Sequence, residues 1–287
     1  MLARLRKATR WGAILAALAL LGCSTIKFAY NNVDWLLLEQ ADDYLDLNDS
    51  QHKHAEQLVA ARMRAHRRDE LPEYVTTLKQ VRVMLSDNLT ADEVVDIKQQ
   101  MEVLYRRTMS ATIPGIVSLL VELDNAQIDH LQARFAERNQ EFEDNFMPSS
   151  LQVRLERRVE RSTRMVEYFT GSLNDEQVTL ITRRRNAMPL TAEDWLAYHR
   201  GRQKTLVAML RRHASNAELE SFLTAWWVNL ADQPPALARK MKINTDAWSQ
   251  LMLELDTTLD EGQRQHLLDK LDLFIKEFSE LAAENKT

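Results

Sequence analysis

Apolar residues recur at steps of three and four positions along most of the chain. The pattern is clearest near the C-terminus, where charged residues separate Leu267, Leu271, Phe274, Phe278 and Leu281. This spacing places the apolar side chains on one face of an α-helix. No window shows the sustained two-residue alternation that is typical of a half-buried strand. We therefore predict an all-α protein, built as a multi-helix bundle or as stacked antiparallel helical hairpins.

A recurring five-residue form marks the predicted helix starts. A leucine is followed by Asn, Thr or Asp, and an acidic or amide residue stands three positions after that second residue. The second residue can cap the first turn, the later residue can return the hydrogen bond, and the leucine can pack onto the helix. Five segments have this form: Leu47–Gln51, Leu89–Glu93, Leu173–Gln177, Leu190–Asp194 and Leu259–Gln263.

Proline and glycine indicate where the helices end. Breaks are expected at Pro72, Pro114-Gly115, Pro148, Gly171, Pro189 and Pro234-Pro235. With the starts, they predict about ten helices, near residues 34–46, 48–70, 72–87, 90–110, 115–146, 149–170, 174–187, 191–213, 216–231 and 235–283, the last interrupted near residue 258. Since the connections are short, we expect residues 34–287 to form one all-helical domain of antiparallel neighbours, with Met147-Pro148 as the best candidate for a boundary between two lobes.

Residues 1–23 have the features of an export signal. Four positive charges precede an apolar run of about ten residues, which is too short to span a bilayer, and the run ends in Leu20-Leu21-Gly22-Cys23. This ending resembles the lipobox of bacterial lipoproteins, which implies that residues 1–22 are removed as a signal peptide and that Cys23 is acylated. Residues 23–33 would then be the lipidated cysteine and a short tether. Ser24 follows Cys23, and in enteric lipoproteins, which the signal resembles, a residue other than Asp here implies the periplasmic face of the outer membrane.

Cysteine content and charge narrow the chemistry. Cys23 is the only cysteine, so no second thiol is available for a disulfide or for a zinc site. The formal net charge is −5, and removal of the four positive charges in residues 1–22 makes it −9. An acidic body does not favour nucleic acid as a partner.

The segment AYNNVDWLLLEQADDYLDLNDSQ, residues 29–51, resembles an uncharacterised family of Gram-negative lipoproteins that is known only as a domain of unknown function. The resemblance implies an outer-membrane location and a helical body and supplies no activity. We take its recognisable residues as a candidate interaction surface, with packing of Trp35 onto the body and local pairing of the aspartates as the structural alternative. These residues are Tyr30, Asn31, Trp35, Asp42, Asp43 and Tyr44.

Three of the predicted helix starts keep a glutamine at the fifth position, and this form resembles the signature of the Spy and CpxP group of small periplasmic helical chaperones and stress regulators. A capping box produces the same letters without kinship. The resemblance therefore supports a chaperone-like function only as an alternative.

One predicted helix carries a basic patch formed by Arg154, Arg157, Arg158, Arg161 and Arg164. Glu156 and Glu160 interleave with these arginines, so local ion pairs on a solvated face are the simpler interpretation. Contact with anionic lipid headgroups, lipopolysaccharide or an acidic partner is the functional alternative.

The patterns of common catalytic and metal sites are missing from the sequence. No histidine has Glu three positions before it, as a di-iron bundle requires. The segment that begins at Asp46 lacks the glycine and the final glutamate of an EF-hand, and there is no Gly-x-Ser-x-Gly or glycine-rich phosphate loop. We therefore expect no cofactor, no metal and no catalytic residues.

Together these features predict an outer-membrane-anchored periplasmic helical lipoprotein that acts as a non-enzymatic interaction protein. Its anchor is Cys23, and its partner is a protein or another envelope component that the sequence does not identify. Two alternatives remain open: a Spy-like chaperone or envelope-stress binding protein, and an enzyme with an unfamiliar site.

Overall fold

The computed structural model describes residues 25–284, so Cys23 and the predicted signal peptide lie outside the described residues. The described residues contain helices and turns but no strand, which confirms the predicted all-α class. The elements are α2 (Thr25–Asn31), α3 (Val33–Leu45), α4 (Asp49–Ala65), η1 (His66–Glu70), α5 (Leu71–Met84), α6 (Ala91–Leu120), α7 (Asn125–Phe146), α8 (Leu151–Thr170), α9 (Asp175–Ala187), α10 (Ala192–Arg211), α11 (Asn216–Leu223), η2 (Thr224–Val228), α12 (Pro235–Asp256) and α13 (Glu261–Ala283). The two elements η1 and η2 are π-helical turns.

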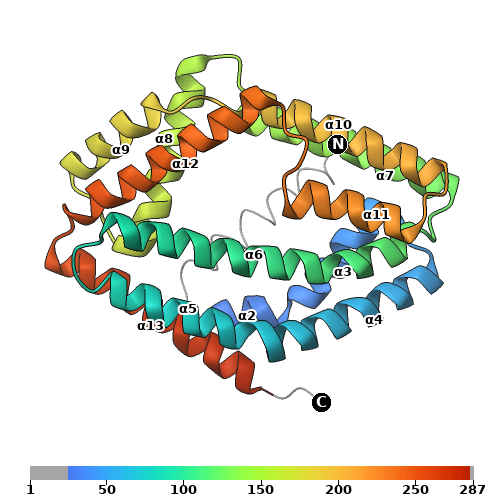
Figure 1. Ribbon diagram of the computed structural model, residues 1–287, viewed down its shortest axis with the longest axis horizontal. Coiled ribbons are helices and arrows are strands. Elements are labelled where there is room, and N and C mark those ends of the chain that lie inside the picture. Colours follow the sequence, from blue (N-terminus) through green and yellow to red (C-terminus); the bar gives the residue numbers. More distant parts are fainter. Residues whose placement is uncertain (1–24, 285–287) are drawn as a thin grey trace, which may run out of the picture.

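The helices pack mainly as antiparallel neighbours, as Figure 1 shows. Helices α4 and α5 join through η1 into one rod along the bottom of the view, and α6 runs back above it. Helices α7 and α10 pair at the top, while α13 crosses below and packs against α5. Short connections therefore set the arrangement, as the bundle prediction requires.

Two groups of buried apolar residues hold the helices together. The larger group joins α3, α4, α6, α7, α10 and α11 with the first turn of α12, and Val117, Leu219 and Leu237 are among its fully buried members. The smaller group joins α8, α9 and α12 through residues such as Ile181 and Leu251. Helix α8 begins after the suggested lobe boundary near residue 147, but α10 and α11 return to the larger core. The second core is therefore not separated from the first at a single point of the chain.

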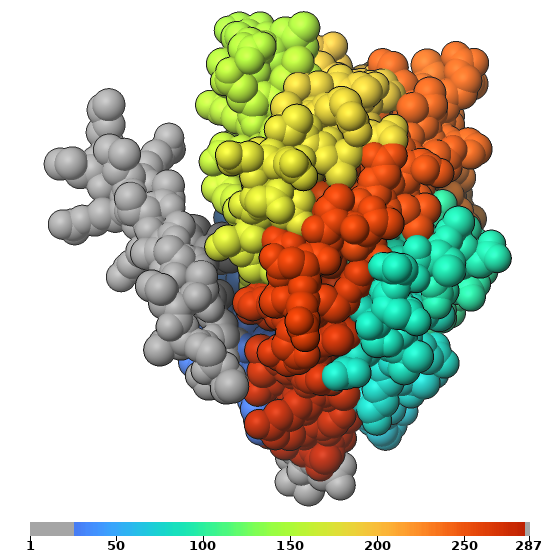
Figure 2. Space-filling model, turned by 90° about the vertical axis from the view of Figure 1, so that its left-hand side faces the viewer, coloured from blue at the N-terminus to red at the C-terminus, as the bar shows by residue number. Residues whose placement is uncertain are grey.

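Figure 2 shows the molecule from the side of the smaller core. Residues of α9, in yellow, lie beside those of α12 and α13, in orange to red. Helix α8 ends at Gly171, whose backbone φ of 79° lies in the left-handed region that favours glycine. The chain therefore reverses there and returns as α9.

The recurring leucine form predicts most helix starts correctly. Complete capping boxes form at Asn48, Thr90, Asn174 and Asp260. Thr191 precedes α10 but makes no hydrogen bond through its side chain, so this start is uncapped. Two further capping boxes, at Asp124 and Ser215, begin α7 and α11. Leu123–Gln127 has the same recurring form as the five predicted starts.

Four of these capping boxes also fasten helices to one another. At one pair of helix starts, the side-chain amides of Gln51 and Gln127 exchange hydrogen bonds of 3.1 and 2.7 Å. Each amide also donates to a backbone carbonyl beside the other helix start, Gln51 to Glu122 and Gln127 to Asp46. We call this arrangement a glutamine clasp, and it joins the N-termini of α4 and α7 at the right-hand end of Figure 1.

A second glutamine clasp joins α9 and α13 with the same pattern. Gln177 and Gln263 exchange hydrogen bonds of 2.8 and 2.9 Å. Gln177 donates to the Thr258 carbonyl and Gln263 to the Ser172 carbonyl. The glutamine of the recurring form therefore has a double structural duty, in its own cap and across to a second helix.

Two predicted features of the backbone are wrong. Pro114 does not end a helix, because α6 continues through it to Leu120; the carbonyl that loses its usual partner belongs to Ser110, which is exposed to solvent. The first predicted helix begins near residue 34, but residues 25–31 already form helix α2. The predicted break at Pro72 coincides with the start of α5, where the proline lies in the first turn, and the π-turn η1 before it keeps the path from α4 helical.

Candidate functional site

The N-terminal helix α2 is fastened to the body through polar contacts. Tyr30 Oη lies 2.8 Å from His66 Nδ1, and burial raises the pKa of Tyr30 to about 12. Arg67 donates to Asn31 Oδ1 over 3.0 Å and lies over the Tyr30 ring at 5.2 Å from its centroid. Lys27 extends the contact by pairing with Glu280 of α13. Tyr30 and Asn31 therefore face the protein and position the segment that follows residue 24.

The centre of this contact is a buried carboxylate on the π-turn η1. Glu70 is only 4% exposed, and it accepts charge-assisted contacts from Arg62 Nη2 at 2.7 Å and from Thr108 Oγ1 at 2.6 Å. His66 Nε2 lies 3.8 Å from the same carboxylate. Burial lowers the pKa of His66, although the charge of Glu70 opposes that effect. The network holds α2, η1 and α6 together, although Nη1 of Arg62 is buried without a hydrogen-bond partner among the described residues.

This network could not be predicted from the sequence. A π-turn has no readable signature, and His66 and Glu70 stand in a run of charged residues that is typical of a solvated helix face. The one feature of the sequence that indicates a π-turn here is the charged run followed by Pro72.

The outer face of α2 and α3 is exposed and changes character along its length. Phe28 on α2 is 64% exposed, and Trp35 in the first turn of α3 is 59% exposed. Glu39 and Asp42 continue this face and are also exposed. The face is thus aromatic next to the N-terminus and acidic farther along the chain.

The remaining residues of the candidate interaction surface make contacts within the protein. Asp43 pairs with Arg134 and Arg138 of α7; burial alone would raise its pKa, but these two arginines outweigh burial and lower it. Tyr44 packs edge-on against Phe135. Asp42 accepts a hydrogen bond from the Leu47 backbone at 3.2 Å while staying exposed. Of the six residues, Trp35 and Asp42 are the exposed ones.

The basic patch on α8 divides into two kinds of arginine. The exposed Arg164 pairs with Glu160 one turn earlier on the same helix, as the sequence predicts. Arg154 pairs instead with Glu193 of α10. Arg157 donates to the Asp144 carbonyl at the end of α7. Arg158 is instead buried, with Nη1 donating to the Met188 carbonyl over 2.9 Å. A uniformly solvated face is therefore wrong for this helix.

The buried part of the basic patch continues onto α9. Burial, together with the charges of Arg158 and Arg161, lowers the pKa of Arg185 to about 10. Arg185 lies in a run of three arginines, and the sequence does not show that its side chain turns inward toward α8 while Arg183 stays exposed. The position of Arg185 near the end of α9 is set by tertiary packing.

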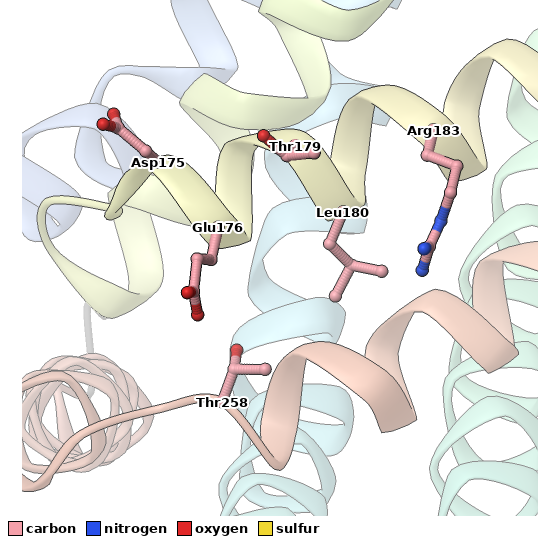
Figure 3. A pocket seen from close by; sticks show the side chains of 6 residues that line it. All are labelled: Asp175, Glu176, Thr179, Leu180, Arg183 and Thr258. Carbon is pink, nitrogen blue, oxygen red and sulfur yellow. The ribbon is translucent and has the colours of Figure 1, made fainter.

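Two hollows on the surface show no convergence of catalytic groups. Figure 3 shows the first, a hollow of about 400 Å³ between α9 and the turn after α12. Glu176 and Arg183 point toward α12, whereas Asp175 points away. The second, of about 540 Å³, lies at the end of α7 around Met147 and Pro148.

The described part of the chain contains neither a cluster of metal ligands nor a membrane-spanning helix. Within residues 25–284, no group of three His, Cys, Asp or Glu side chains is placed to hold a metal ion. None of the helices in the same range has the length and apolar character needed to cross a bilayer.

The fold and these sites define an all-helical protein with a docked N-terminal helix and two polar centres, one around Glu70 and one around Arg158. The chain belongs to the family of unknown function DUF6279, whose model matches residues 43–227. The match covers the first glutamine clasp and the basic patch, and it begins after Tyr30, Asn31 and Trp35. Neither the search of curated proteins nor that of solved structures gave a match.

Proposed function

We propose that this protein is a lipid-anchored, non-enzymatic interaction protein of the outer membrane, with Cys23 as the acylated residue and the helical body as the part that binds a protein or another envelope component. The observation that carries the proposal is the docked start of the described chain. Helix α2 begins at Thr25, two positions after Cys23, and Tyr30 and Asn31 fasten it to η1. An acylated Cys23 would then hold the body beside the bilayer through a very short linker.

The exposed face of α2 and α3 supports this arrangement. Aromatic side chains favour the boundary between lipid headgroups and acyl chains, so Phe28 and Trp35 suit the part nearest the anchor. Glu39 and Asp42 are repelled by anionic headgroups and suit the part that points into the aqueous space. This gradient would place Trp35 at the membrane boundary and present Asp42, the other exposed residue of the candidate interaction surface, to a partner in the aqueous space.

The anchor is tested with Cys23→Ser in cells that are supplied with labelled palmitate. The full-length protein should take up label, and Cys23→Ser should take up none and should accumulate as a soluble protein or as an uncleaved precursor. Label that still enters the variant would contradict the proposed anchor.

The interaction surface is tested with a photo-crosslinking amino acid at position 35. Ile243 on α12 is the matched control, because it is also apolar and is 52% exposed. We expect defined crosslinks to lipid or to one envelope protein from position 35, lost when Cys23 is also changed, and none of them from position 243. Equal crosslinking from both positions would contradict a specific surface. Suppression of model-substrate aggregation by the purified protein would favour a chaperone function instead.

A further inference from the structure

Arg158 on α8 carries a positive charge that the protein does not compensate. Its side chain is 8% exposed, and Nη1 donates to the carbonyls of Met188 and Pro189 at 2.9 and 3.5 Å. Within residues 25–284, Nε and Nη2 are buried and have no hydrogen-bond partner. A buried charge is normally paired with an opposite charge or saturated with hydrogen bonds, and an arginine cannot escape the cost by losing its proton.

Two more arginines without an ion pair in the described residues lie next to Arg158. Arg161 on α8 and Arg185 on α9 are partly buried, and the charges of Arg158 and Arg161 lower the pKa of Arg185 in addition to burial. The Nε atom of Arg185 is buried without a partner, and its Nη1 contacts only the sulfur of Met188. In the described part of the chain, none of these three arginines forms an ion pair with a carboxylate.

A shortage of acidic residues does not explain this cluster. The chain has 42 acidic residues against 37 lysines and arginines, and neighbouring arginines find partners. Arg154 pairs with Glu193, and Arg184, directly before Arg185, pairs with Glu254. The uncompensated charges are therefore gathered at one place, where α8 meets the end of α9.

Aromatic rings fix the outer two guanidinium groups. Arg161 lies over the ring of Phe146 at 4.7 Å, and Arg185 lies over the ring of Trp248 at 5.3 Å, each measured from Cζ to the ring centroid. A ring face holds the plane of a guanidinium and leaves its N–H edge available for an acceptor. Arg161 and Arg185 are thus the partly exposed members of the cluster, and Arg158 is its buried member.

We propose that Arg158, Arg161 and Arg185 form a binding site for a phosphate group, carried either by a lipid headgroup or by a small soluble phosphate. Guanidinium groups donate in forks that match the oxygens of a phosphate, and a phosphate oxygen can accept from more than one of them. A soluble phosphate carries nearly two negative charges at neutral pH and a lipid phosphodiester carries one, and both present more acceptor oxygens to the cluster than a carboxylate does. The phosphate site does not depend on acylation of Cys23, so a failure of one proposal leaves the other intact.

The test uses the full-length protein, purified in a nonionic detergent and a phosphate-free buffer. The melting temperature is measured with inorganic phosphate, with pyrophosphate, and with micelles that contain phosphatidylglycerol or phosphatidylcholine, each against chloride at the same ionic strength. The variants are Arg185→Met and Arg161→Met. The matched control is Arg183→Met, because Arg183 is on the same helix as Arg185 but its side chain is 71% exposed.

We expect a phosphate-bearing probe to raise the melting temperature of the natural protein and of Arg183→Met. In Arg185→Met and Arg161→Met, the dissociation constant for that probe should rise roughly tenfold to a hundredfold, since each variant loses a charge-assisted hydrogen bond. A response to the soluble probes identifies a small phosphate as the ligand, and a response only to phosphatidylglycerol identifies a headgroup. Equal shifts in all variants, or no shift beyond that of chloride, would overturn the proposal.

Discussion

Replacement of Gln177 by Leu should destabilise the protein far more than its position at a helix start suggests. Gln177 is fully buried, and its amide donates to the Thr258 carbonyl and to Gln263 while it accepts from Gln263 in return. Leucine has a similar size, so the main effect is the loss of hydrogen bonds. The Thr258 carbonyl and the Gln263 amide would each lack one buried partner, and at about 1–3 kcal/mol for each orphaned group the expected loss is about 3 kcal/mol.

The second half of this prediction concerns the pair. Gln263→Leu alone should cost about as much, since it leaves the Gln177 amide and the Ser172 carbonyl short of a partner. The double variant contains neither amide, so no amide is orphaned across the clasp, and the Thr258 and Ser172 carbonyls stay without their partners together with the Asn174 and Asp260 backbone N–H groups of the two caps. Its loss of stability should therefore be smaller than the sum of the single losses, by about 3 kcal/mol.

Urea denaturation followed by the helical circular dichroism signal measures all three variants. Gln152→Leu is the control, because Gln152 lies on the exposed first turn of α8 and belongs to no clasp. A single substitution that costs less than about 1 kcal/mol would show that solvent or local rearrangement satisfies the orphaned groups. Strict additivity in the double variant would show that the two amides do not depend on each other.

Two further predictions concern the N-terminal contacts. Asp43→Asn should lower the stability by about 1 kcal/mol in a thermal melt, because it breaks a partly exposed pairing with two arginines of α7. Asp42→Asn is the control and should have almost no effect. A larger loss for Asp42→Asn than for Asp43→Asn would contradict the contacts described. Since burial lowers the pKa of His66, the unfolded chain binds its proton more readily than the folded chain does, and stability should fall as the pH drops below about 6.5. His66→Gln should reduce this dependence, and an unchanged pH profile in denaturation experiments would contradict the neutral, buried state of His66.

Helix starts could be predicted because their determinants are local. Asn48, Thr90, Asn174 and Asp260 each act through residues within one turn, so the letters alone are sufficient. The same rule applied to Leu123–Gln127 would also have located the break between α6 and α7, which the sequence analysis assigned to Pro114. A proline removes one backbone hydrogen bond of a helix, whereas a capping box begins a new helix. The capping box at Asp124 therefore sets the boundary between α6 and α7.

The polar centres could not be predicted because their determinants are distant in sequence. Arg158 becomes a buried residue only where the end of α9 folds over α8, through contacts with Met188 and Pro189. Glu70 likewise depends on Thr108 of α6 and on a π-turn that turns a polar run inward. Interleaved charges on one helix are typical of a solvated face, and only the neighbouring helices decide otherwise.

The contact of Lys27 with Glu280 brings the two ends of the described chain together. Residues 25–284 could therefore be circularly permuted with a short connecting peptide, and new ends could be opened in the turn between α7 and α8 without cutting a helix. The same geometry has a practical effect on fusion proteins. A fluorescent reporter attached at the C-terminus would stand beside α2, and it would therefore report on the surroundings of the N-terminus rather than on the far side of the bundle.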